Sequence, residues 1–182
     1  MSDSGKTGFQ FYDNLVGRTS GIQITKIIVA SATITVGDMV QLSNGFIDLA
    51  GTGTPIVGVV VGLVDKNGID LSNTRESFTQ AAYTASTRTV VCGSNNQTVD
   101  KVQAVVDIDP FSRWVAETDN GNTDGQTRLM GCFTDIVAAS DQVDDDTAAD
   151  NTQAQLLIWG ANPDGSASNI YSIAEHQFWQ AA

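Results

Sequence analysis

The sequence predicts a mainly β protein, built as an antiparallel β-sandwich or as small β-barrel units with an extended N-terminal arm. Three observations support this fold class. Glycine makes up 17 of the 182 residues, and valine, isoleucine, threonine and serine are abundant. Short runs of alternating apolar and polar residues are separated by turn residues, a pattern typical of half-buried strands. Helical periodicity is almost absent, and the segment 75–84 is only a weak helix candidate.

Turn signals set the order of the predicted strands. Asn44 and Gly45, flanked by apolar alternation, predict a tight hairpin. The longest apolar run, 56–64, predicts a buried strand, and its Gly58 and Gly62 indicate a bulge or a close backbone approach. The predicted strands are 22–30, 39–42, 46–49, 56–64, 87–92, 99–108, 114–118, 129–138, 153–159 and 170–178.

Glycine-rich linkers suggest how the chain is divided. We expect residues 1–21 to form an N-terminal arm and linker and residues 22–182 to form a β-rich body. The body divides further into a small β-barrel unit at 22–65 and a second β unit at 85–182. Deleting residues 1–17 is expected to leave a folded body.

Aromatic residues at both ends of the chain are the candidate partner-binding residues. Phe9, Phe11 and Tyr12 lie in an arm that is too short to bury them, so they are expected to cover a partner surface. Phe178 and Trp179 lie within five residues of the last residue and form the second candidate pair.

The charge balance excludes several partner classes. The chain has 21 acidic and 9 basic residues and a formal net charge of −12. We therefore expect no nucleic-acid partner, because phosphate binding needs clustered lysine and arginine, and no anionic membrane partner. Glycines interrupt the longest apolar run, so no membrane span is expected. Residues 1–8 are polar and do not resemble a signal peptide, which predicts synthesis in a cytoplasm.

The sequence offers no catalytic, cofactor or metal-binding constellation. The single histidine, His176, has no recognisable nucleophile motif to serve, and is expected to be structural. One histidine with Cys92 and Cys132 cannot make a zinc site, and the two thiols are expected to be reduced. The aspartate-rich segment 141–151 lacks the ligand spacing of a calcium loop, so a solvated acidic loop is expected.

Asp107 and Asp109 form the only carboxylate pair that invites a catalytic interpretation, that of a glycosidase. Such a pair needs environments that push the two pKa values apart, which a sequence does not show. Asp109 precedes Pro110, and the Asp-Pro dipeptide favours a turn. We therefore interpret the pair as structural.

Two phrases in the last half of the chain carry a family resemblance. One is V-D-I-D-P-F at residues 106–111, and the other joins A-Q-L-L-I-W-G at 154–160 with I-Y-S-I-A-E-H-Q-F at 170–178. Together they resemble the capsid decoration, or cement, proteins and minor head structural proteins of tailed phages.

The resemblance implies a structural virion protein that is not an enzyme. Such a protein decorates the outer capsid surface and stabilises it by bridging neighbouring major capsid subunits. It implies two partners, the major capsid protein and further copies of this chain, with a homotrimer favoured. The protein would be made in the host cytoplasm and located on the virion. Two alternatives remain, a carbohydrate- or receptor-binding module of a phage tail or fibre and, more remotely, a small hydrolase.

Overall fold

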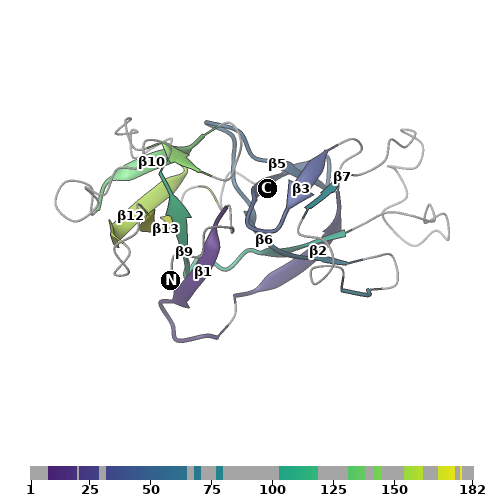
Figure 1. Cartoon of the computed structure of the whole chain (residues 1–182), viewed down its shortest axis with the longest axis horizontal. Helices are drawn as coiled ribbons and strands as arrows, with labels where there is room; N and C mark the ends of the chain where they lie inside the picture. Colours follow the sequence, from purple (N-terminus) through teal and green to yellow (C-terminus); the bar gives the residue numbers. More distant parts are fainter. Residues whose placement is uncertain are drawn as a thin grey trace.

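The chain folds into antiparallel β-sheets (Figure 1). The computed structural model describes residues 8–19, 21–28, 32–64, 68–70, 77–79, 103–118, 131–137, 142–144, 154–161, 168–174 and 177. The named strands of this part form sheets of six, five and two strands, and every pair of named strands is antiparallel. The two larger sheets pack together as in a β-sandwich, which confirms the predicted fold class.

The six-stranded sheet gathers strands from both ends of the chain. Its order is β1-β9-β13-β12-β10-β11, so β1 lies at one end and pairs only with β9 among the described strands. An isolated bridge between Thr118 and Val143 connects the end of β9 to β11, so the sheet curls back on itself. The bounds are β1 (Gln10–Asn14), β9 (Ser112–Glu117), β10 (Phe133–Ile136), β11 (Val143–Asp144), β12 (Leu156–Ala161) and β13 (Ser168–Ile173).

The five-stranded sheet has the order β2-β8-β6-β4-β5. A bridge between Ile28 and Ile47 brings the end of β2 to β5, so this sheet curls as well. The two-stranded sheet, β3 (Thr33–Thr35) with β7 (Ser77–Thr79), completes the set. The bounds of the five strands are β2 (Gln23–Ile27), β4 (Met39–Ser43), β5 (Phe46–Leu49), β6 (Gly58–Val64) and β8 (Gln103–Asp107).

Two of the predicted turn features are present. Asn44 and Gly45 have φ angles of 52° and 82° and join β4 to β5, as expected of a two-residue hairpin loop. The β6–β8 register shifts between Val60 and Gly62. At Gly58 a Cβ atom would lie 2.1 Å from the carbonyl oxygen of Asp107, so only glycine lets β6 approach β8 this closely.

Each larger sheet contributes to the core between them. Met39 and Val59 of the five-stranded sheet pack with Trp114, Leu156 and other residues of the six-stranded sheet in one buried cluster. The neighbouring residues on the same strands, Val40 and Val60, belong to a second cluster on the other face of the five-stranded sheet. The five-stranded sheet is therefore buried on both faces, because alternate residues of a strand point to opposite faces.

The two sheets do not correspond to consecutive parts of the chain, and this corrects the predicted division. Strand β8, at 103–107, pairs with β2 and β6, so it belongs to the unit predicted at 22–65 rather than to the unit at 85–182. Strand β1 lies in the predicted arm, yet it belongs to the six-stranded sheet. The chain crosses between the sheets after β1 and again after β8.

The N-terminal segment is part of the body over residues 9–14. Phe9 is 3% exposed and packs in the core cluster between the sheets, with its ring edge against Tyr171 at 6.3 Å between centroids. A partner cannot reach a side chain so buried, so the prediction that Phe9 contacts a partner is wrong. The expectation that deletion of residues 1–17 leaves the body intact is corrected as well, because the deletion removes a core side chain and a paired strand.

Within the described residues, we find no helix whose length and apolar character would allow it to cross a membrane.

Candidate interaction surface

Two segments of the chain connect one large sheet to the other and lie side by side, and residues of the candidate site lie on them. We call these segments the crossings. The first, residues 15–22, leads from β1 to β2, and the second, residues 108–111, leads from β8 to β9. The backbone N–H of Ile108 donates to the carbonyl of Ile22 at 2.7 Å, and that of Leu15 donates to the carbonyl of Phe111 at 2.9 Å. These bonds hold the two crossings against each other.

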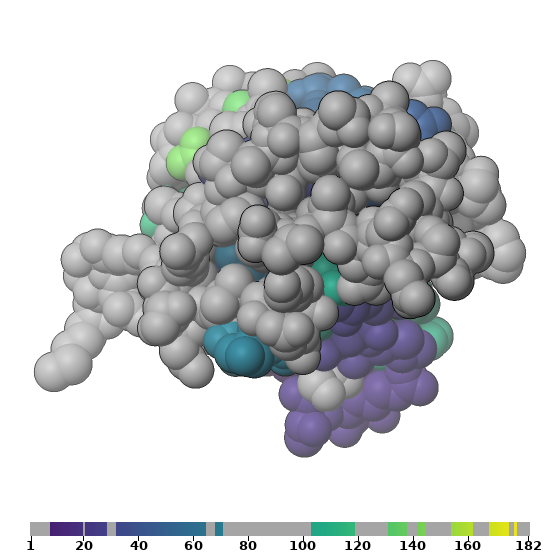
Figure 2. Space-filling view, turned by 90° about the vertical axis from the view of Figure 1, so that its right-hand side faces the viewer, coloured from purple at the N-terminus to yellow at the C-terminus, as the bar shows by residue number. Residues whose placement is uncertain are grey.

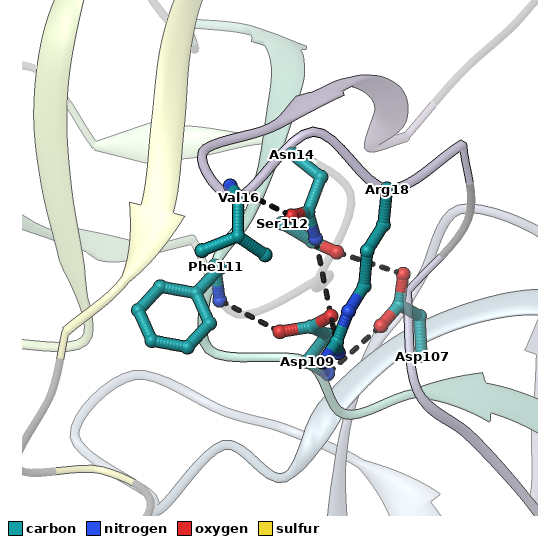
Figure 3. Close-up of polar contacts among 7 residues, drawn as sticks. All are labelled: Asn14, Val16, Arg18, Asp107, Asp109, Phe111 and Ser112. Atoms are coloured by element: carbon teal, nitrogen blue, oxygen red, sulfur yellow. Dashed lines mark hydrogen bonds and ion pairs between the residues drawn. The ribbon is translucent and has the colours of Figure 1, made fainter.

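Asp109 is the central acceptor between the two crossings (Figure 3). Its side chain is fully buried, and its Oδ2 accepts hydrogen bonds from Asn14 Nδ2 at 3.1 Å and from Arg18 Nη1 at 2.8 Å. Its Oδ1 accepts the backbone N–H of Phe111 at 3.0 Å. Asn14 is the last residue of β1 and Arg18 lies in the crossing that follows, so this carboxylate ties the first crossing to the second.

Asp107, the last residue of β8, also accepts hydrogen bonds where the two crossings meet. Its Oδ1 accepts the N–H of Asp109 at 2.8 Å, an aspartate-turn bond, and its Oδ2 accepts the hydroxyl of Ser112 at 3.0 Å. A Cβ atom at Gly21 would lie 2.0 Å from Oδ1 of Asp107. The first crossing therefore passes directly against this carboxylate, and Gly21 leaves the room for it. We call Asn14, Arg18, Asp107, Asp109 and Ser112 the aspartate clasp.

The pKa values of the two carboxyl groups of the clasp are shifted in opposite directions. Burial raises the pKa of Asp107 above its ordinary value, and the hydrogen bonds from Asp109 and Ser112 only partly offset this effect. Burial acts in the same direction on Asp109, but the hydrogen bonds from Phe111, Arg18 and Asn14 and the Arg18 charge outweigh it and lower its pKa. The difference follows from the donors around Asp109, first the Phe111 N–H and then the Arg18 and Asn14 side chains, and from the Arg18 charge.

A pair of carboxyl groups with divergent pKa values is also the signature of an acid–base pair. Here, however, both residues are only 3% exposed, and both oxygens of each carboxylate accept hydrogen bonds from the protein. No oxygen is left pointing at a position where a substrate could bind. The geometry therefore supports the structural interpretation of Asp107 and Asp109.

The clasp gives a pH-dependent prediction for Asp107→Asn. A raised pKa in the folded state means that the charged form of Asp107 costs stability, and this cost appears as pH rises through the folded pKa. The amide removes the cost, and its NH2 group can donate to Ser112 Oγ. We expect the stability of the variant relative to the native chain to be higher near pH 7 than near the ordinary pKa of 3.8. Urea unfolding of both chains across this range measures the difference.

The pKa of Asp109 is shifted in the opposite direction, and this shift does not affect the difference in stability between the two chains. Its lowered pKa means that its stabilising contribution is present above the ordinary value of 3.8 and is lost as pH falls through the folded pKa. Both chains retain Asp109, so both should lose that contribution at the acidic end. A difference between the chains that does not change with pH would show that Asp107 does not titrate in this window.

Exposed apolar side chains lie along β1 and beside the aspartate clasp. Seven large hydrophobic side chains are exposed in the described part of the chain, and six of them lie on β1, on the crossing that follows it, or on the facing turn. Val16 and Phe111 lie next to each other to the left of Asp109 in Figure 3. In Figure 2 the purple N-terminal residues project from the surface. We define the apolar patch as Phe11, Tyr12, Leu15, Val16 and Phe111, which are 39%, 40%, 45%, 54% and 45% exposed.

A β-bulge lies at the exposed aromatic residues of β1. The register of β1 with β9 shifts between Phe11 and Asp13, so Tyr12 is the extra residue. The Phe11 ring meets the Trp114 ring edge-on at 5.5 Å between centroids. Tyr12 and Asp13 both contact Arg113, whereas Phe11 lies on the opposite side of the strand against Trp114, and both aromatic side chains are exposed at the edge of the sheet.

Arg113 borders the patch on the outer side of β9. Its Nε donates to Asp13 Oδ1 at 2.6 Å, and its Nη2 contacts the other carboxylate oxygen. The guanidinium carbon lies 5.8 Å from the centre of the Tyr12 ring and 5.4 Å from that of Trp159. Tyr12 is thus held by a cation–π contact as well as by the bulge.

Of the five predicted partner-binding residues, the structure places only Phe11 and Tyr12 on a surface. Phe9 is in the core, as described above, and Phe178 and Trp179 lie outside the described residues, as do His176 and Cys92. Cys132 is half-buried. Within the described part of the chain, no group of three or more histidine, cysteine or acidic residues could hold a metal ion.

Sequence reasoning missed Leu15, Val16 and Phe111, which complete the patch. Asn14 was a sequence signal for a turn at this position, because asparagine side chains commonly accept the N–H two residues on. In the structure its Oδ1 accepts the N–H of Val16 at 3.0 Å. A turn just after a strand exposes the apolar residues that follow. The distance in sequence between Val16 and Phe111 concealed that they belong to one surface.

Comparison with known proteins adds no relative: no family model, no curated protein and no solved structure matches the chain.

Proposed function

We propose that this protein is a structural virion protein that decorates and stabilises the outer surface of a tailed-phage capsid by bridging neighbouring major capsid subunits. The observation that carries the proposal is the apolar patch, because exposed apolar side chains concentrated on one strand, the crossing that follows it and the facing turn mark a site of protein interaction. The resemblance of residues 106–111, 154–160 and 170–178 to phage decoration proteins supports the choice of partner.

The patch is held in shape before a partner arrives. The carbonyl of Asn14 accepts the N–H of Gly17 at 2.9 Å, and its side chain accepts that of Val16. The N–H of Leu15 is bonded to Phe111, and that of Phe111 to Asp109. Because these turns are already ordered, binding does not have to order them, and more of the contact free energy appears as affinity.

A stabilising role follows by mass action. A protein that binds the assembled shell and not the dispersed subunits stabilises the shell by an amount that grows with its free concentration. The proposed arrangement is a homotrimer on the outer capsid surface, made in the host cytoplasm, with no nucleic-acid or membrane partner and no cofactor. The full use of the clasp oxygens supports a role without catalysis.

The test is binding of the purified chain to assembled capsid shells that lack it. We expect the chain to co-sediment with shells, to saturate at a fixed ratio to the major capsid protein, and to raise the temperature at which shells dissociate. Phe11→Ser with Phe111→Ser should weaken binding by about tenfold or more, the loss typical of interface hot spots. Gel densitometry of bound shells gives the ratio. Absence of co-sedimentation at micromolar concentration would refute the proposal.

One observation favours the alternative, a carbohydrate- or receptor-binding module of a phage tail or fibre. Tyr12 and Trp159 both lie against Arg113 on one surface, and aromatic rings are common contact surfaces for sugars. The ratio of bound chain to major capsid protein distinguishes the two functions, because a decoration protein is present in many copies per particle and a tail module in few. Binding to host-cell glycans without binding to shells would favour the alternative.

A further inference from the structure

Arg18 gives the apolar patch a charged border. The described residues include three cations, Arg18, Lys26 and Arg113, in a chain whose formal net charge is −12. Arg113 is paired with Asp13 through two of its nitrogens and is mostly buried, with 21% of its side chain exposed. Arg18, in contrast, has 48% of its side chain exposed and contacts Asp109 through Nη1 alone.

The contact with Asp109 fixes the direction of Arg18 without using up its donors. A guanidinium has five N–H donors in a rigid planar fork, which suits it to two carboxylates at once. Arg18 is two residues from Val16, and both lie over Asp109 in Figure 3. A partner that covers the patch would therefore meet an oriented, half-exposed cation next to its apolar contacts.

We propose that the patch docks against a protein face that presents a carboxylate beside an apolar hollow, with Arg18 shared between Asp109 and that carboxylate. This inference rests on the proposed function and names the chemistry of the capsid surface that the patch meets. Aromatic side chains and arginine are the residues most enriched at interface hot spots, and the patch combines them.

Charge argues against a second copy of this chain as the occupant. A twofold contact uses the same surface on both partners, so it would bring the two Arg18 side chains, each already paired with its own Asp109, into one interface. An acidic, apolar face on a different protein satisfies both the cation and the hydrophobic side chains.

The sharpest test uses opposite charges at Val16, which is 54% exposed and takes no side-chain part in the clasp. We expect Val16→Asp to weaken binding to capsid shells at least about tenfold more than Val16→Lys, because only the aspartate is repelled by the carboxylate opposite. Raising the salt concentration should shrink the difference. Both variants should keep the native melting temperature, since the site is exposed.

Arg18→Gln provides the second measurement, with Lys26→Gln as the matched control on a different strand. We expect Arg18→Gln to lower the affinity about tenfold, or about 1.4 kcal/mol, and to flatten its salt dependence. Lys26→Gln should change neither. Native shells that bind the two Val16 variants equally well would overturn the inference and leave the proposed function standing.

Two further outcomes are decisive. A native chain that fails to bind shells removes the proposed function, and the inference with it. If sedimentation velocity shows that the chain self-associates and that the Val16 and Arg18 variants dissociate it, the patch binds a second copy and the inference is wrong.

Discussion

Replacing Gln155 by leucine should lower the free energy of unfolding by about 3 kcal/mol or more. Gln155 is fully buried, and its Nε2 donates to the carbonyls of Gly51 at 2.8 Å and Thr54 at 2.6 Å. Its Oε1 accepts the N–H of Ile136 at 3.1 Å. Leucine fills a similar volume but leaves the Thr54 carbonyl and the Ile136 N–H without these partners, and each buried unsatisfied group costs about 1–3 kcal/mol. The Gly51 carbonyl keeps its bonds from Thr54.

The loss should be large because Gln155 joins the two sheets. It lies next to β12 of the six-stranded sheet, and two of its partners lie on the loop that leads from β5 to β6 of the five-stranded sheet. Gln177 acts in parallel, accepting the N–H of Ile56 at 3.1 Å and donating to the carbonyl of Ala154 at 3.2 Å. We call these residues the glutamine clasp.

Urea unfolding followed by circular dichroism measures the change, with Gln41→Leu as the matched control. Gln41 is half-buried and donates one side-chain bond, to the carbonyl of Leu49 at 2.9 Å, so its replacement should cost only about 1 kcal/mol. Equal losses for the two variants would contradict the role given to Gln155.

Asp109→Ala is the second substitution with a large expected effect, also about 3 kcal/mol. It removes the acceptor of three hydrogen bonds, from Asn14, Arg18 and Phe111. Breaking a buried ion pair from one side costs about 3–5 kcal/mol, and the half-exposed Arg18 can regain water, which places the loss at the lower end. Because the same bonds hold the patch, shell binding should weaken even at temperatures where the variant remains folded.

Thermal unfolding and shell binding are both needed for this variant. Asp48→Ala is the control, since Asp48 accepts only the neighbouring N–H of Leu49, at 2.9 Å, on a half-buried site. That change should stay within about 0.5 kcal/mol, the usual range for surface substitutions. Native-like binding by folded Asp109→Ala would show that the clasp does not order the patch.

The fold class and many strands follow from sequence because their signals are local. The Asn44-Gly45 hairpin and the glycines of β6 are defined by neighbouring residues, and the structure confirms both. The assignment of strands to sheets was wrong for β1 and β8, because it depends on pairings between distant segments that alternation alone does not specify.

The candidate site was predictable only in part for the same reason. Phe11 and Tyr12 stood out as aromatic residues before the first expected strand, but the burial of Phe9 depends on Tyr171 and other residues far along the chain. The turn at Asp109 was expected from Asp-Pro, whereas its contact with Asn14 spans 95 residues. No periodicity in either segment encodes that contact.

The interleaving of the two sheets has a consequence for synthesis on the ribosome. Strand β1 finds its partner only when β9 at Ser112–Glu117 has emerged, and β2 waits for β8 at Gln103–Asp107. The five-stranded sheet therefore cannot close before Asp107 has emerged, and the six-stranded sheet cannot close before Ile173 has emerged. Folds dominated by such distant pairings form slowly, and their unpaired strand edges are exposed to aggregation meanwhile. Recombinant yield should thus depend on growth temperature and on chaperone supply more than the stability of the finished protein would suggest.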